Sequence, residues 1–137
     1  MTADELKKII QSGEKIDVEF KQSENDLTKD VYQSVCSFNN RNGGHIVLGV
    51  VDKTKEIRGV NFQKVDKILK DFTTSINNAN KLNPPMYLTP EVFEIDGKIL
   101  VYIWVPEGTD LNVKPVKAQG VNVENTNSIN TNIEASS

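Results

Sequence analysis

The sequence has 137 residues, 26% of them charged, and a formal net charge of −3 at pH 7. This length predicts one domain that is large enough to bury a hydrophobic core. No apolar run approaches the roughly 20 residues that a membrane-spanning helix needs. One cysteine, Cys36, excludes an internal disulfide, and one histidine, His45, excludes a Cys/His zinc cluster within the chain, so any metal would need carboxylates, hence Mg²⁺ or Mn²⁺.

The first expected helix begins with a capping box formed by Thr2 and Glu5 and ends at Gly13. The N-terminal residues 1–8 lack the charged-then-apolar layout of a signal peptide, and a lone cysteine fits a reducing compartment, so we expect a cytoplasmic protein. Apolar and charged residues then alternate over residues 16–21, which is typical of a half-buried strand with Glu19 and Lys21 on one face.

A second helix is expected from Thr28 to about residue 39, with glycines 43 and 44 marking its exit. Residues 45–51 are almost all apolar and β-branched, which favours a central strand covered on both faces. A short strand at 56–60, a helix at 65–76 and a hairpin of 91–95 with 98–105 follow. Within these elements, we expect Cys36 and Trp104 to lie in the core.

This order predicts an α+β fold of two layers, in which about three helices pack on one mixed sheet. The connection from Lys21 to His45 holds a full helix, which is long enough to join parallel strands. Lys21 and Asp52 would then lie near each other at one edge. We expect one domain at residues 1–117 and a low-complexity, disordered tail at 118–137, where Asn, Ser and Thr dominate.

A basic segment lies between residues 53 and 70. It carries six Lys or Arg residues against two acidic ones, and three of the lysines recur at every third position of a helix. A solvated helix surface and a phosphate-contacting surface both fit this pattern. With Lys21, the candidate nucleic-acid-binding residues are Lys53, Lys55, Arg58, Lys64, Lys67 and Lys70.

Three motifs occur together in the chain. Glu14 precedes Val18-Glu19-Phe20-Lys21, a helix ends in Phe38-Asn39-Asn40-Arg41-Asn42-Gly43-Gly44, and a strand ends in Gly49-Val50-Val51-Asp52. Their order and spacing resemble the Schlafen AlbA-type domain of bacterial transcriptional regulators and animal Schlafen proteins. The resemblance covers about residues 10–117, and the family's usual strand after Lys114-Pro115-Val116 has no counterpart in residues 119–137.

The resemblance implies nucleic-acid binding, most often DNA binding in a transcriptional regulator. The animal relatives imply an alternative, a metal-dependent endoribonuclease that cuts structured RNA. Its three carboxylates would correspond to Glu14, Glu19 and Asp52, which would hold Mg²⁺ or Mn²⁺, and Lys21 would stabilise the developing phosphate charge.

Two further expectations concern ligands and partners. The sequence has no Gly-x-x-x-x-Gly-Lys-Ser/Thr loop, so we expect no ATP site, although older labels of the family mention an ATPase. A lone domain of this kind could form a homo-oligomer to cover exposed strand edges. A protein-interaction module without nucleic-acid affinity is a third interpretation, which the acidic net charge keeps open.

Overall fold

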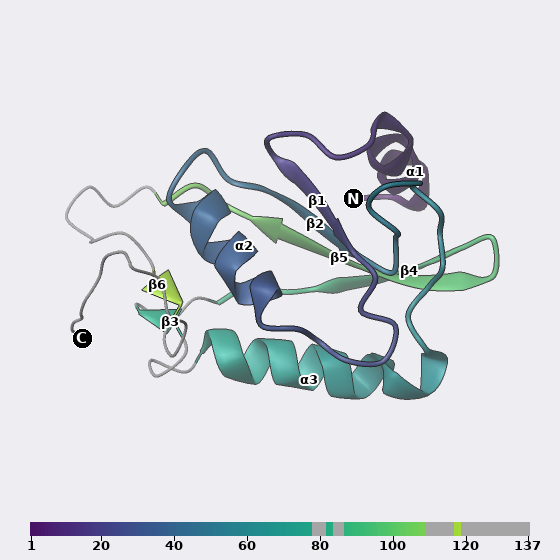
Figure 1. Cartoon of the computed structure of the whole chain (residues 1–137). Helices are drawn as coiled ribbons and strands as arrows, with labels where there is room; N and C mark the ends of the chain where they lie inside the picture. Colours follow the sequence, from purple (N-terminus) through teal and green to yellow (C-terminus); the bar gives the residue numbers. More distant parts are fainter. Residues whose placement is uncertain (78–81, 84–86, 109–116, 119–137) are drawn as a thin grey trace.

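A four-stranded mixed sheet forms the centre of the computed structural model, which describes residues 1–77, 82–83, 87–108 and 117–118 (Figure 1). The strand order is β1-β2-β5-β4, with β1 and β2 parallel and the other neighbours antiparallel. The strands are β1 (Val18–Lys21), β2 (Gly44–Leu48), β4 (Glu91–Ile95) and β5 (Lys98–Val105). The predicted parallel pair and the predicted hairpin are therefore confirmed.

Helices pack on both faces of this sheet. The helices are α1 (Ala3–Ser12), α2 (Asp30–Asn39) and α3 (Val65–Ile76), with a short 3₁₀ turn, η1 (Phe62–Lys64), before α3. The apolar faces of α2 and α3 pack on Ile46, Leu48 and the odd-numbered residues of β5, while α1 packs on Val18, Phe20 and Val47 on the opposite face. The α+β class, with a mixed sheet and three helices packed on it, is confirmed.

Local sequence explains where these elements begin and end. Thr2 and Glu5 form the predicted capping box, and Gly13 follows α1 as its C-cap. Strand β2 contributes side chains to both core clusters, as its apolar run predicts. None of the helices in the described ranges is long and apolar enough to cross a membrane.

A second, two-stranded sheet pairs β3 (Leu82–Asn83) with β6 (Lys117–Ala118) in antiparallel register. Residue 118 is the first of the predicted tail, and residues 119–137 lie outside the described residues. The division into a domain at 1–117 and a tail at 118–137 stays a prediction.

Two sequence predictions are wrong. Residues 56–60 form no strand, because Gly49 O accepts from the N–H groups of both Arg58 and Gly59, which leaves one isolated bridge between Val50 and Ile57. Trp104 is 55% exposed. Its position in β5 places it on the α1 face of the sheet, opposite His45 of β2 in the strand register. The core cluster that includes α1 does not extend to this position.

Cys36 is buried in α2, as predicted, and this burial raises the pKa of its thiol to about 12. Because only the thiolate attacks a disulfide reagent, we expect the native protein at about pH 8 to react at least about 100-fold more slowly than the chain unfolded in guanidinium chloride. Stopped-flow labelling with an aromatic disulfide reagent measures both rates. Equal rates would show that Cys36 is accessible in the folded state.

Candidate functional site

The candidate site begins with the alternation of side chains along β1. Val18 and Phe20 are buried under α1, so Glu19 and Lys21 point to the opposite face, toward α2. Because β1 is an edge strand, these two long side chains reach the rim of the sheet without being fully buried. The Glu-x-Lys spacing thus places an acid and a base side by side against a helix.

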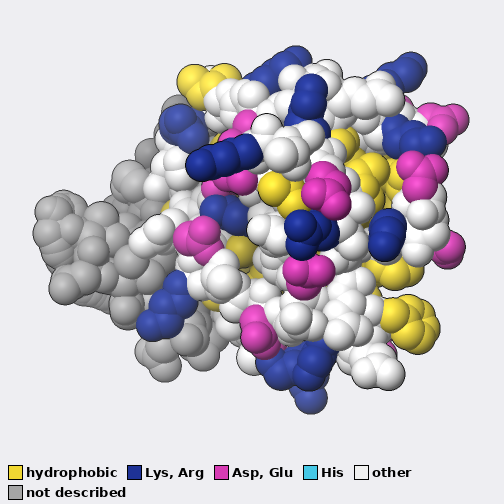
Figure 2. Space-filling model, turned by 45° about the vertical axis from the view of Figure 1, so that its right-hand side comes forward, with side chains coloured by type: hydrophobic (Ala, Val, Ile, Leu, Met, Phe, Trp, Pro, Cys, Tyr) yellow, Lys and Arg dark blue, Asp and Glu magenta, His cyan; other side chains and the backbone are white. Residues whose placement is uncertain are grey.

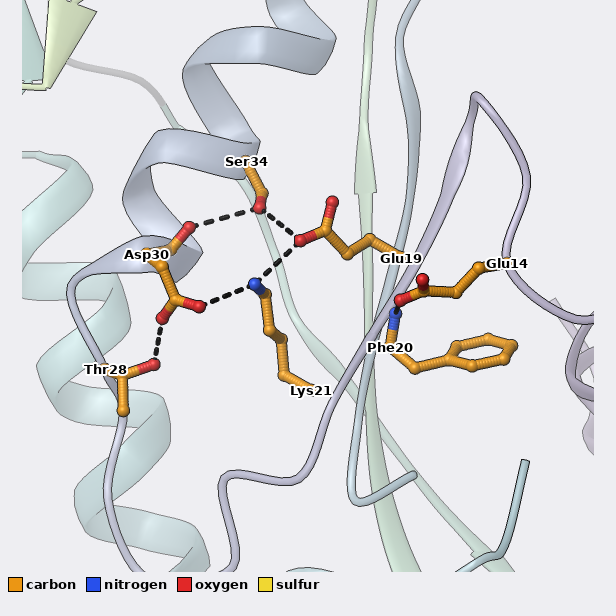
Figure 3. Close-up of polar contacts among 7 residues, drawn as sticks. All are labelled: Glu14, Glu19, Phe20, Lys21, Thr28, Asp30 and Ser34. Carbon is orange, nitrogen blue, oxygen red and sulfur yellow. Dashed lines mark hydrogen bonds and ion pairs between the residues drawn. The ribbon is translucent and has the colours of Figure 1, made fainter. Parts of the chain in front are cut away.

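Five side chains then meet between β1 and α2 and are called the Lys21 cluster: Glu19, Lys21, Thr28, Asp30 and Ser34 (Figure 3). Lys21 Nζ lies 2.7 Å from Glu19 Oε2 and 2.7 Å from Asp30 Oδ2. Ser34 Oγ lies 2.9 Å from Glu19 Oε2 and 3.1 Å from the carbonyl oxygen of Asp30, and Thr28 donates to the Asp30 carboxylate. The cluster therefore joins β1 to the first two turns of α2.

Electrostatics in the Lys21 cluster favour the charged forms of its ion pairs. Burial alone would lower the pKa of Lys21, but its hydrogen bonds to Asp30 and Glu19 outweigh that effect and raise it. Burial alone would raise the pKa of Asp30, but hydrogen bonds from Lys21 and Thr28 outweigh it and lower the value. Lys21 is 17% exposed while Asp30 is 51% exposed, so solvent weakens the pair on the Asp30 side.

An open pocket of about 240 Å³ lies over this cluster. Its other walls come from one face of α2, and the complete lining is Glu19, Lys21, Asp30, Gln33, Ser34, Ser37 and Phe38. Two carboxylates surround one ammonium group, so the pocket does not offer an unpaired cation to a phosphate. Lys21 would have to leave Glu19 or Asp30 before it could serve in the role predicted for it.

The three carboxylates of the nuclease alternative have different surroundings. Glu19 belongs to the Lys21 cluster, whereas Glu14 Oε2 accepts the backbone N–H of Phe20 at 2.9 Å and points away from that cluster (Figure 3). This bond satisfies a donor on the free edge of β1. Asp52 is exposed in the turn after Val51. Across the described ranges, no three His, Cys, Asp or Glu side chains are grouped so that they could hold a metal ion.

The basic segment is exposed, and several of its charges have partners. Lys55 Nζ donates to Gln11 O at the C-terminus of α1, at 3.0 Å. Arg58 pairs with Glu56 at 3.3 Å and with Glu24 at 4.0 Å, and Lys67 pairs with Asp71 at 2.8 Å. Among the residues that the structure describes, no carboxylate pairs with Lys53, Lys64 or Lys70.

The sequence prediction missed Thr28, Asp30 and Ser34. The second helix was expected to begin at Thr28, but its N-cap is Lys29, and the Thr28 hydroxyl donates to the Asp30 side chain. Ser34 is the one buried polar side chain among the described residues, and a serine one turn after an aspartate in an amphipathic helix is the signal that could have identified it. Their partners on β1 depend on how α2 packs, which the sequence alone does not show.

Comparison with known proteins supports this fold. The chain is 32% identical over 125 residues to an uncharacterized ATP-binding protein of Ureaplasma parvum, covering 80% of this chain and 34% of that protein. The solution structure of the N-terminal domain of a RecG-related protein from Nitrosomonas europaea shares the fold, with a TM-score of 0.68 and 21% identity over 98% of this chain and 91% of that one.

A second solved structure, the DIP2311 protein of Corynebacterium diphtheriae, has a TM-score of 0.57 at 15% identity and covers 84% of this chain and 23% of that one. This chain therefore spans about a third of the length of its curated relative and less of the DIP2311 protein. Residues 14–133, which include the Glu-Phe-Lys strand and the glycine pair, match the family described as Schlafen, AlbA_2. The chain belongs to the Schlafen AlbA_2 family.

Proposed function

We propose that this chain is a nucleic-acid-binding domain, with DNA as its expected ligand, in a cytoplasmic transcriptional regulator. The observation that carries the proposal is that Lys64 and Lys70 protrude from the exposed side of η1 and α3 with no carboxylate partner among the described side chains. Family membership and a solved neighbour related to a DNA helicase, RecG, point the same way. When unpaired lysines neutralise phosphates, the counterions condensed on the nucleic acid are released, and this release drives such binding.

The charge distribution predicts the character of this binding. Figure 2 shows Lys and Arg side chains interspersed with Asp and Glu side chains on one face, and the net charge of the whole chain is −3. Binding would then rest on a few local phosphate contacts. We expect weak sequence preference, micromolar or weaker affinity at physiological salt and a strong gain at low salt.

The test is a fluorescence-anisotropy titration of the whole chain on labelled duplex DNA and on a structured RNA, at low salt, with Mn²⁺ and with EDTA. Binding in both buffers without cutting supports the proposal. Metal-dependent cutting would favour the endoribonuclease alternative instead, and loss of cutting in Glu19→Ala would place Glu19 in that site. The absence of binding and cutting at low salt would leave the protein-interaction module.

The double variant Lys64→Ala/Lys70→Ala is expected to weaken duplex binding roughly tenfold at low salt, because two phosphate contacts are lost. Lys8→Ala/Lys15→Ala is the matched control, because it removes the same amount of charge from two other exposed positions. Lys8 lies in α1, and Lys15 lies in the loop between α1 and β1. Equal weakening in both double variants would mean that total charge, rather than the α3 surface, decides affinity.

A further inference from the structure

Phe62 is the first residue of η1, and 79% of its surface is exposed. It belongs to neither core cluster of the described structure. Isolated exposed apolar side chains are ordinary on protein surfaces, so exposure alone indicates no function. The surroundings of Phe62 distinguish it from Trp104, which is also exposed.

The turn that carries Phe62 is held in place by Asn61. The Asn61 side chain accepts from Gln63 N at 3.0 Å and donates to Asn25 Oδ1 at 2.9 Å. The Asn61 backbone N–H donates to Glu24 O at 2.7 Å, and its carbonyl accepts from Lys64 N at 2.8 Å. A ring on such a fixed turn can stack on a planar partner with little further loss of backbone entropy.

This turn also lies at the carboxyl edge of the parallel strands. Glu24 and Asn25, in the segment that follows β1, accept hydrogen bonds from Asn61, while the carbonyl of Gly49, just after β2, accepts from the N–H groups of Arg58 and Gly59. In open sheets with parallel strands, ligands bind outside the carboxyl ends of those strands. Phe62 therefore lies beside the carboxyl ends of the two parallel strands, β1 and β2.

Cations flank the ring on both sides along the chain. Lys64 follows it in η1, and Arg58 approaches the same segment through Glu24. The ion pairs of Arg58 with Glu24 and Glu56 are exposed and therefore weak, so a phosphate can replace a carboxylate there. Trp104, by contrast, lies on the α1 face, where Glu91 faces the neighbouring Tyr102 across the strands.

An exposed ring with a cation on either side of it in the chain fits an unpaired nucleotide, whose base offers a stacking face and whose phosphates offer charge. We propose that Phe62 stacks on an unpaired base of a single-stranded segment, while Lys64 and Arg58 contact the phosphates beside it. This inference rests on the proposed nucleic-acid function and adds to it a preference for ligands that contain unpaired bases. A paired base in a duplex has no free face to offer.

The experiment measures binding of the whole chain to three labelled ligands: a single-stranded oligonucleotide, its duplex, and a strand of equal length made of abasic nucleotides. Phe62→Ala is expected to weaken single-strand binding roughly five- to hundredfold, to change abasic-strand binding little, and to be rescued by Phe62→Trp. Trp104→Ala is the matched control, an exposed aromatic residue on the other face of the sheet. It should bind as the wild type does.

The outcomes separate the two proposals. If the wild type binds nucleic acid and Phe62→Ala binds each of the three ligands as tightly as the wild type does, the stacking inference is overturned and the proposed function stands. An equal loss on the normal and abasic strands would also overturn it, because the effect would not depend on a base. If the wild type binds none of the ligands at low salt, the proposed function itself fails.

Discussion

Gly43→Ala is expected to lower the free energy of unfolding by roughly 3–4 kcal/mol. This is the largest loss of stability that we expect from any substitution discussed for this protein. Gly43 has a φ of +80°, and a Cβ there would lie 2.7 Å from Val105 O and 3.0 Å from Glu107 N. These are backbone atoms at the end of β5 and just after it, so a side-chain rotation cannot relieve the clash. Urea unfolding followed by circular dichroism measures the loss.

Gly97→Ala is the matched control for this substitution. Gly97 has a similar φ of +77° in the β4–β5 turn, but a Cβ there would meet nothing within 4 Å. It should lose only the conformational part, about 1 kcal/mol. Equal losses of unfolding free energy in the two variants would mean that the close approach of Gly43 to the end of β5 does not affect stability.

Lys21→Met is expected to lower the free energy of unfolding by about 1–2 kcal/mol near neutral pH, because it leaves the Glu19 and Asp30 carboxylates side by side without their cation. Methionine keeps most of the apolar stem, so the change is mainly electrostatic. Lys67→Met is the control, since the Lys67–Asp71 pair is exposed on both sides and its loss should matter by less than about 0.5 kcal/mol. A loss as small for Lys21→Met as for Lys67→Met would show that the Lys21 cluster adds no stability.

The pH dependence of this difference has a defined sign. The lowered pKa of Asp30 gives stability that is present above its unfolded-state value, about 3.9, and is lost as the pH falls through the folded value. The raised pKa of Lys21 gives stability that is present below its unfolded-state value, about 10.4, and is lost as the pH rises through the folded value. The gap between wild type and Lys21→Met should therefore be widest between about pH 5 and pH 10 and should narrow at both ends. A gap that is constant with pH would contradict the ion-pair account.

Short-range patterns predicted most of the fold. The capping box, the alternation in β1, the apolar run of β2 and the hairpin of residues 91–95 with 98–105 each depend on neighbours in the chain, and each was confirmed. The errors arose where contacts between residues that are distant in the sequence determine which side chains are buried. Trp104 was expected in the core, but the core cluster that includes α1 does not extend to that end of the sheet.

The candidate site was predictable only in part. The family resemblance identified Glu19 and Lys21, and the strand pattern placed them on one face. Asp30 and Ser34 complete the cluster because α2 packs across β1, which no local signal shows. Similarly, the count of basic residues could not show that Arg58 and Lys67 meet carboxylates while Lys64 and Lys70 do not.

The most direct test of the proposed function is the salt dependence of duplex DNA binding by the wild type and by Lys64→Ala/Lys70→Ala. The logarithm of the binding constant should fall linearly with the logarithm of salt concentration, and the double variant should reduce that slope by roughly 2, because two phosphate contacts are lost. A wild-type affinity that does not change with salt, or a slope that is the same in the double variant, would contradict nucleic-acid binding through the α3 surface.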